Sequence, residues 1–442
     1  MKGLDLARNE RKLNGAWLAS AVVILVCRSM QYAGAIWGLM FPDSNEYLKF
    51  HIGDFIQGNA MSDRPPVYPI FLHAMEKVFG EGYLTAVVWV QVALSMMAVV
   101  LFAKTLANIG VDNPWRQLCT TAYACTPATT GWDTCILTES FSLSLTVAFF
   151  YSITKYLKEK RLHNGISAII FTAILIFLRP QFLTYWAILV VFCVLRYMFP
   201  EQKEERKHIL KMAMALILCG IVVLMYSFHF QKQFGIFSLT AAKPRQDLVV
   251  CGERGYYVDF DDPEITATML SAITEGKAFY GTDDVITQFG YKRAQMVTHN
   301  YFAKHKIKYV LDTIHVMMIN GRKMLDGYAQ LNVDAPQWVQ DMSYVAAGVF
   351  QMGCIIQAIL LSIMSGVIMV IQWIRYKKMP WLWMAFFSIL FTTTVLTFFI
   401  TCGEYMRTMI SSLPYLYCII GLMLQFAVNF SKRMKQKGKS LL

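Results

Sequence analysis

The feature that most constrains this 442-residue chain is a series of long apolar blocks separated by short polar linkers. A helix that crosses a lipid bilayer needs about 20 mostly apolar residues. Blocks of that kind, some of them short, predict an all-α polytopic membrane protein with about ten transmembrane helices. The blocks lie at residues 16–40, 84–107, 135–156, 166–178, 182–197, 210–230, 344–374, 381–402 and 409–430, with a weaker one at 115–130.

The formal charge of +12 indicates which side of the membrane each linker faces. Lys and Arg collect on the cytoplasmic side of transmembrane helices. Strongly basic linkers at 155–161, 201–211, 375–378 and 432–439 all fall on the side of the basic N-terminus when the spans alternate. We therefore expect a multi-pass cell-membrane protein with both termini in the cytoplasm. A nucleic-acid partner is not expected, because no clustered basic face with aromatic residues is present on a soluble domain.

The alternation of cytoplasmic and outer linkers divides the chain into three parts. Residues 1–230 are expected to form a transmembrane core whose first outer loop is 41–69. Residues 231–343 are expected to form a mostly helical extracytoplasmic segment, and residues 344–442 to add C-terminal transmembrane helices and a basic cytoplasmic tail. Residues 67–79 leave two alternatives open, because so short an apolar stretch predicts either an interfacial helix or a further membrane crossing.

Acidic residues lie at the predicted outer ends of several transmembrane helices. Asp43 and Glu46 would share one face of a helix, where a carboxylate could act as general base on a hydroxyl. Asp43 fits equally well as a helix cap. Asp133 and Glu139 flank the start of a later span, and Glu139 would lie about one turn inside it. An unpaired buried carboxylate is costly, so Glu139 needs a cavity or an ionic partner, for which the candidates are Arg28, Arg179 and Arg407.

Arginines also gather at the outer ends of spans. Arg64 and Tyr68 belong to the sequence Asp-Arg-Pro-Pro-Val-Tyr-Pro, whose prolines stiffen the loop. Arg179 precedes a proline between two short spans, and Glu404 and Arg407 lie in a late outer turn. A guanidinium at this level can bind a phosphate bidentately or extend to the lipid headgroups. Carboxylates and arginines together at the level of the lipid phosphates suggest an enzyme that acts on a phosphate-linked lipid.

The order of these motifs resembles that of the GT-C glycosyltransferases, specifically the bacterial relatives of protein O-mannosyltransferases and aminoarabinose transferases. The resemblance rests on Pro-Asp-Ser-x-x-Tyr after the first span, then Arg-Pro-Pro-x-Tyr-Pro, then Thr-Glu at the outer start of a later span, then Arg-Pro. It covers roughly residues 14–200 and is weaker at 386–424, and it does not extend to 231–341. Such enzymes are multi-span proteins that take a sugar from a polyprenyl-phosphate carrier on the outer face of the membrane.

The resemblance implies roles for individual residues. Arg64 and Tyr68 would shape the lipid-phosphate site, and Glu139 would lie near the sugar. Arg179 and Arg407 would bind the phosphate of the carrier. Asp133 and Glu404 are further candidates for substrate binding.

The mechanism implied by the resemblance is an inverting transfer to an acceptor hydroxyl. Asp43 would take the hydroxyl proton, the oxygen would attack the anomeric carbon, and polyprenyl phosphate would leave with its charge offset by an arginine. Where the family has an Asp-Glu pair in the first loop, this chain has Asp43 and Glu46, so both are candidates for catalysis. The expected partners are the lipid-linked sugar donor, a glycan, lipid or protein acceptor, and membrane lipid. No cofactor is expected, and the lack of a Trp-Trp-Asp type motif argues against a required divalent metal.

Three other classes fit parts of the pattern. An O-antigen ligase or polymerase would use arginine and histidine side chains of its large outer loop, where His299 and His305 are available. A flippase or transporter of the same lipid would show internal repeats, and none is visible in the sequence. A non-catalytic scaffold is the third. One structural feature distinguishes the glycosyltransferase from the ligase or polymerase. In the first, Asp43 and Arg179 would face one cavity; in the second, the loop around His299 would line it.

Overall fold

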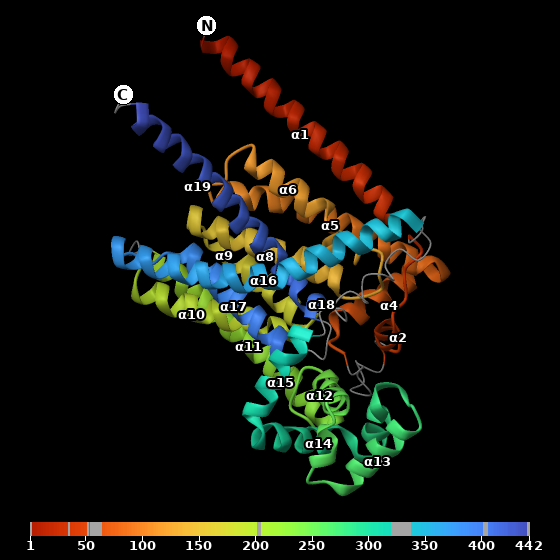
Figure 1. Cartoon of the computed structure of the whole chain (residues 1–442). Coiled ribbons are helices and arrows are strands. Elements are labelled where there is room, and N and C mark those ends of the chain that lie inside the picture. The colour runs from red at the N-terminus through yellow and green to blue at the C-terminus, as the bar shows by residue number, and fades with distance from the viewer. Residues whose placement is uncertain are drawn as a thin grey trace.

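Helices are the named secondary-structure elements in the part of the chain that the computed structural model describes, residues 2–33, 36–50, 53, 64–200, 205–319, 337–400 and 405–439. Figure 1 shows a bundle of long helices with both termini at one end and a group of shorter helices at the other. The bundle contains α1 (Lys2–Tyr32), α4 (Val67–Phe79), α5 (Tyr83–Asn108), α6 (Trp115–Cys125), α8 (Glu139–Glu159), α9 (Leu162–Ile176), α10 (Leu183–Met198), α11 (Glu205–Phe234), α16 (Gln337–Tyr376), α17 (Trp381–Ile400) and α19 (Leu413–Lys439).

Six helices in the described residues are long and apolar enough to cross a membrane, by length and composition. Their outward faces are apolar too: on α11, Met214, Leu218 and Met225 are 63%, 63% and 66% exposed. Such a surface is unfavourable in water but is solvated by lipid chains. The prediction of an all-α polytopic membrane fold is confirmed, while the count of about ten spans stays a prediction. The six are Gly15–Tyr32, Val67–Asn108, Pro180–Met198, Glu205–Phe234, Ala358–Tyr376 and Arg407–Ser431, and shorter apolar helices lie at Leu162–Ile176 and Trp381–Val395.

Helix α8 lies against α5 and α9, and most of its side chains are buried. It is rich in hydroxyl side chains, of which Ser142 and Ser152 donate to the carbonyls of Thr138 and Ala148, four residues earlier. These bonds satisfy the hydroxyls within the helix. Protein contacts on all sides therefore let α8 be less apolar than the helices that face lipid.

Backbone hydrogen bonds join the connecting loops at the end of the bundle opposite the termini. Leu39 N–H donates to the carbonyl of Thr134 (2.8 Å), and the Leu39 carbonyl accepts from Ile136 N–H (3.0 Å). Val67 N–H donates to the carbonyl of Phe177 (3.2 Å). The segment that follows α1 is thereby fixed beside the start of α8, and the loop before α4 is fixed beside the loop after α9.

Four further helices form the short-helix group at this end of the molecule: α12 (Ala242–Glu253), α13 (Pro263–Thr274), α14 (Thr282–Lys304, kinked at Gly290) and α15 (Lys306–Ile319). Helix α13 begins after Asp262, whose side chain accepts from Ile265 N–H, with a proline in the first position. Leu248, Met269 and Val285 are buried in a small apolar core between α12, α13 and α14. The sequence predicts helices over 264–273 and 285–304, and α13 and α14 confirm them.

Candidate active site

Five side chains from separate segments form one network of ion pairs. Arg64 Nη2 lies 2.8 Å from Asp43 Oδ1, and Arg407 Nη2 lies 2.8 Å from Asp43 Oδ2. Glu139 Oε1 accepts from Arg407 Nε and lies 2.8 Å from Arg179 Nη1. The network therefore runs from Arg64 through Asp43, Arg407 and Glu139 to Arg179. Three guanidinium groups against two carboxylates leave one positive charge in excess.

Both carboxylates of the network lie in the first turn of a helix. Asp43 follows a proline at the start of α2 (Pro42–Leu48), and Glu139 is the first residue of α8. Unpaired N–H groups and the helix dipole favour negative charge at these positions. The Glu139 side chain is 0% exposed, so guanidinium groups must replace the water that would otherwise solvate its charge. Two of its predicted partners, Arg179 and Arg407, fill this role.

Prolines constrain the backbone beside two of the arginines. Arg179 is extended, with φ −148° and ψ 117°, the conformation that a following proline favours. Arg64 also precedes a proline, and its guanidinium lies over the ring of Tyr47, 5.6 Å from the centroid. Arg407 belongs to the short helix α18 (Tyr405–Met409). The three guanidinium groups thus reach the same place from three stiff segments.

The network lines one cavity of about 440 Å³. Asp43, Arg64, Arg179 and Arg407 all contribute to its wall. Its volume falls in the range of small-ligand sites, about 300–1,000 Å³. Asp43 and Arg179 therefore face one cavity, and among the described residues that line it there is no histidine.

Asp43 is held in its ionised form by its neighbours. Burial raises the pKa of the Asp43 carboxyl, but the guanidinium groups of Arg407 and Arg64 outweigh burial and hold the pKa below its ordinary value of 3.8. A carboxylate held in this way accepts a proton poorly while both arginines remain in place. Its basicity increases when an anionic ligand takes over one of the guanidinium groups.

Asp133, predicted to bind substrate, lies in a different polar group. Its carboxylate accepts from the hydroxyls of Tyr32 and Ser140, both at 2.6 Å, and pairs with Arg28 at 3.4 Å. Arg28, the third predicted partner of Glu139, is therefore engaged here. The group is buried between α1, α5 and α8, and in the described structure its carboxylate does not line the cavity. The contacts of Asp133 hold helices together.

The remaining predicted site residues do not belong to the network of ion pairs. Tyr68 is fully buried behind Tyr47, with the two rings edge to face at 5.3 Å. Glu46 pairs with Lys49 at 2.7 Å and is not among the described residues that line the cavity. Glu404 lies outside the described residues. The structure thus brings the candidate carboxylates Asp43 and Glu139 together with the arginines and leaves Glu46 apart.

The cavity is also lined by residues that the sequence analysis did not identify as site residues. Tyr47 of α2 contributes to it, as do Thr240, Lys243 and Gln246 at the start of the short-helix group. Tyr47 could have been found, because it ends the motif Pro-Asp-Ser-x-x-Tyr. The other three belong to no motif, and their position depends on how α12 packs back onto the bundle.

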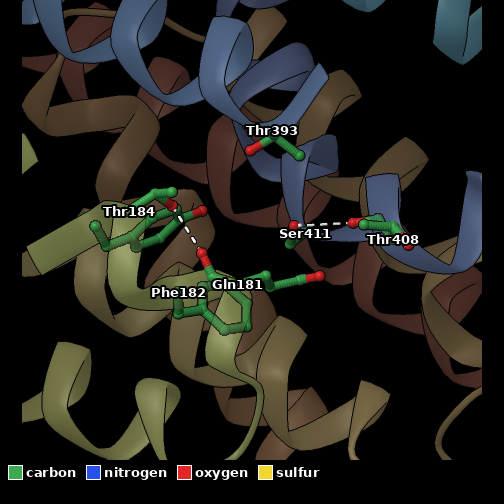
Figure 2. Close-up of a pocket in the computed structure, with 7 residues that line it drawn as sticks. Gln181, Phe182, Thr184, Thr393, Thr408 and Ser411 are labelled. Atoms are coloured by element: carbon green, nitrogen blue, oxygen red, sulfur yellow. Dashed lines mark hydrogen bonds between the residues drawn. The ribbon is translucent and has the colours of Figure 1, made fainter. Parts of the chain in front are cut away.

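A small gap and an apolar groove lie next to the cavity inside the bundle. Gln181, Thr184 and Thr408 line both the cavity and a gap of about 10 Å³, where the Thr184 hydroxyl donates to the Gln181 carbonyl at 2.8 Å (Figure 2). Thr184 also lines a groove of about 330 Å³ between α8, α10 and α17. Phe192 and Trp381 are among the apolar side chains of this groove.

Metal ligands do not gather in the described residues, where no group of three or more His, Cys, Asp or Glu side chains could hold an ion. The carboxylates of Asp43 and Glu139 face arginines instead. The expectation that no cofactor is needed stays a prediction.

Comparison with known proteins gives one similar structure. No protein-family model matches the sequence, and no curated protein matches it. The chain is similar to the crystal structure of the Archaeoglobus fulgidus oligosaccharyltransferase in complex with zinc and sulfate, with a TM-score of 0.46 and 8% sequence identity. The match covers 93% of this chain and 49% of the other, so the chain spans about half the length of that protein. So low a similarity transfers no activity or substrate to this chain.

Proposed function

We propose that the chain is an integral membrane glycosyltransferase that moves a sugar from a polyprenyl-phosphate carrier to an acceptor hydroxyl on the extracytoplasmic side. The main support is the network of Asp43, Glu139 and three arginines along one cavity at the end of an apolar helix bundle. Carboxylates can move protons, guanidinium groups can bind phosphate, and the bundle lies in lipid. An amphiphilic, phosphate-linked donor is the substrate class that matches all three.

The donor phosphate binds among the arginines in this proposal. A guanidinium presents paired N–H donors that match a phosphate bidentately. Arg179 and Arg407 both line the cavity, and the network has one excess positive charge to balance an incoming anion. The carboxylates of Asp43 and Glu139 set the spacing of the guanidinium groups before the ligand arrives, which reduces the cost of ordering them.

The hydrocarbon chain of the donor occupies the apolar groove. The groove lies beside the cavity and shares Thr184 with it. The chain is already surrounded by lipid tails, which are as apolar as the groove, so the groove positions the donor by van der Waals packing and gains no transfer from water. A phosphate near Arg179 with its chain in the groove would span both spaces.

The reaction proceeds by a single displacement. When the phosphate engages Arg179 and Arg407, Asp43 loses the ionic stabilisation that Arg407 supplies and becomes able to take the acceptor proton. The acceptor oxygen forms a bond to the anomeric carbon, the bond from that carbon to the phosphate oxygen breaks, and the electron pair leaves with polyprenyl phosphate. The arginines stabilise the charge that develops on the phosphate, and the anomeric configuration inverts.

The test measures release of polyprenyl phosphate by the protein in nanodiscs, supplied with undecaprenyl-phosphate sugars and a membrane extract as the acceptor source. Loss of a general base lowers the rate by about 10²–10⁴-fold, so Asp43→Asn should show a loss of this size and still bind undecaprenyl phosphate. Glu46→Gln, the same change one turn further along α2 and outside the cavity wall, is the matched control and should retain activity.

Different failures contradict different parts of the proposal. Full transfer by Asp43→Asn would remove Asp43 from the role of base. Absence of undecaprenyl phosphate binding by the unmodified protein would contradict the donor class. Activity that depends on His299 and not on Asp43 would support the ligase class instead.

A further inference from the structure

Helix α15 has two chemically different faces. Its polar face packs against the residues that follow α12: the Tyr256 hydroxyl donates to Asp312 (2.6 Å), and Arg254 Nη1 donates to the Thr313 hydroxyl (2.8 Å). The Arg254 guanidinium also lies over the ring of Tyr309, 5.4 Å from the centroid. At about 100° per residue, these contacts cover one side of the helix.

The opposite face of α15 is apolar and exposed. Ile307, Val310, Leu311 and Ile314 follow the spacing of a single helical stripe, and they are 78%, 37%, 60% and 47% exposed. A contiguous apolar stripe of this kind is unfavourable in water and marks an interaction surface.

The surroundings of α15 indicate what covers this stripe. The helix contacts both α14 and α17, and Figure 1 shows it between the short-helix group and the bundle. On α17, Phe391 is 50% exposed and faces outward, as lipid-facing residues do. Helix α15 therefore adjoins a bundle helix that has apolar side chains on its outer surface. Lys306, exposed beside Ile307, can extend its ammonium to the headgroups.

We propose that α15 is an interfacial helix that inserts Ile307, Leu311 and Ile314 into the lipid leaflet nearest the active-site cavity. An amphipathic helix of this type lies at the boundary of headgroups and acyl chains. Because its other face holds Arg254 and Tyr256, the anchored helix fixes the end of α12, and with it the cavity wall formed by Lys243 and Gln246. This proposal does not depend on the reaction that the site performs.

The test places an environment-sensitive fluorescent amino acid at Leu311 of the full chain in nanodiscs that contain doxyl-labelled phosphatidylcholine. The same residue at Ala267, exposed on α13, is the control. We expect blue-shifted emission and quenching by doxyl lipid at position 311, and neither at position 267. Equal, unquenched signals would overturn the proposal, and so would a blue shift without quenching, because a protein partner would then cover the stripe.

A second measurement uses the unmodified chain, in case the replacement impairs folding. A phosphatidylcholine with a diazirine in its acyl chain is photoactivated in nanodiscs, and crosslinked peptides are identified by mass spectrometry. Crosslinks should appear within 306–319 as well as on α17. Crosslinks on α17 with none within 306–319 would overturn the proposal.

Discussion

Arg407 joins the two halves of the active-site network. Its Nη2 reaches Asp43 while its Nε reaches Glu139, so one planar group contacts both carboxylates. A lysine has a single nitrogen on a flexible stem and cannot reproduce this geometry. The two acids are therefore held apart at a spacing that only an arginine supports.

Arg407→Lys should consequently impair transfer while keeping the charge. A hydrogen bond to a charged group contributes about 1.5–3 kcal/mol, which corresponds to a loss of about 10- to 100-fold in the rate of polyprenyl phosphate release. Lys49→Arg, on the surface end of α2, is the reciprocal control and should have no effect. Equal activity of Arg407→Lys and the unmodified protein would show that only the charge matters.

Glu139→Gln should destabilise the protein. Removal of one partner from a buried ion pair costs about 3–5 kcal/mol, and Glu139 compensates two guanidinium groups with a side chain that is 0% exposed. Thermal unfolding in detergent should show a clearly lower Tm. Glu46→Gln breaks an exposed pair with Lys49, and such pairs contribute about 0–1 kcal/mol. A similar loss in both variants would contradict this role for Glu139.

The contribution of Asp43 to stability should depend on pH in a defined direction. Its pKa lies below the ordinary value of 3.8, so the folded state favours the ionised form. The stability from its ion pairs is then fully present above that value and is lost as the pH falls through the lowered pKa. The Tm difference between the unmodified protein and Asp43→Asn should stay constant from about pH 5 to 8 and shrink below about pH 4.

Among the elements, α13 depends most on a single residue at its start. Asp262 caps the helix and also accepts from Arg293 Nε and Nη2 at 2.7 and 2.9 Å. Arg293 belongs to α14, so the cap also joins the two helices that support α12. The cavity wall on α12 thus depends on a contact outside the cavity.

Asp262→Ala should loosen this group of helices locally. Loss of the cap and of a charge-assisted bond costs about 1–3 kcal/mol, which hydrogen exchange of the peptide 263–274 would report as faster exchange. Asp261→Ala, one residue earlier, removes an exposed pair with Lys304 and should leave the exchange rate unchanged. Faster exchange in both variants would indicate a general effect of charge.

At the scale of the whole molecule, both termini lie at the end of the bundle opposite the short-helix group (Figure 1). The basic linkers predict that this end is cytoplasmic. Reporter fusions at either terminus should therefore read as cytoplasmic, and a reporter inserted near Ala267 as extracytoplasmic. The reverse pattern, or termini on different sides, would contradict the predicted orientation.

The sequence predicted the apolar helices and the acids and arginines of the network, for a physical reason. A charged group at the end of a membrane helix needs a partner, so Glu139 already implied an arginine such as Arg179. Lys243 could not be predicted in the same way, because its place in the cavity wall depends on the packing of α12 against the bundle. Asp133 is also an acidic residue near the end of a predicted span, but it pairs with Arg28 in a separate polar group and not with the arginines of the network.

The closed network of ion pairs also bears on turnover. Asp43 and Glu139 occupy the guanidinium groups that the donor phosphate would use, so these side chains act as built-in competitors for the same positions. In the proposed reaction, arrival of the donor would be an exchange of anions, and its net affinity would be only the difference between two similar sets of contacts. The same exchange would run in reverse after transfer, when the carboxylates would recapture the arginines and help to expel the lipid phosphate into the bilayer.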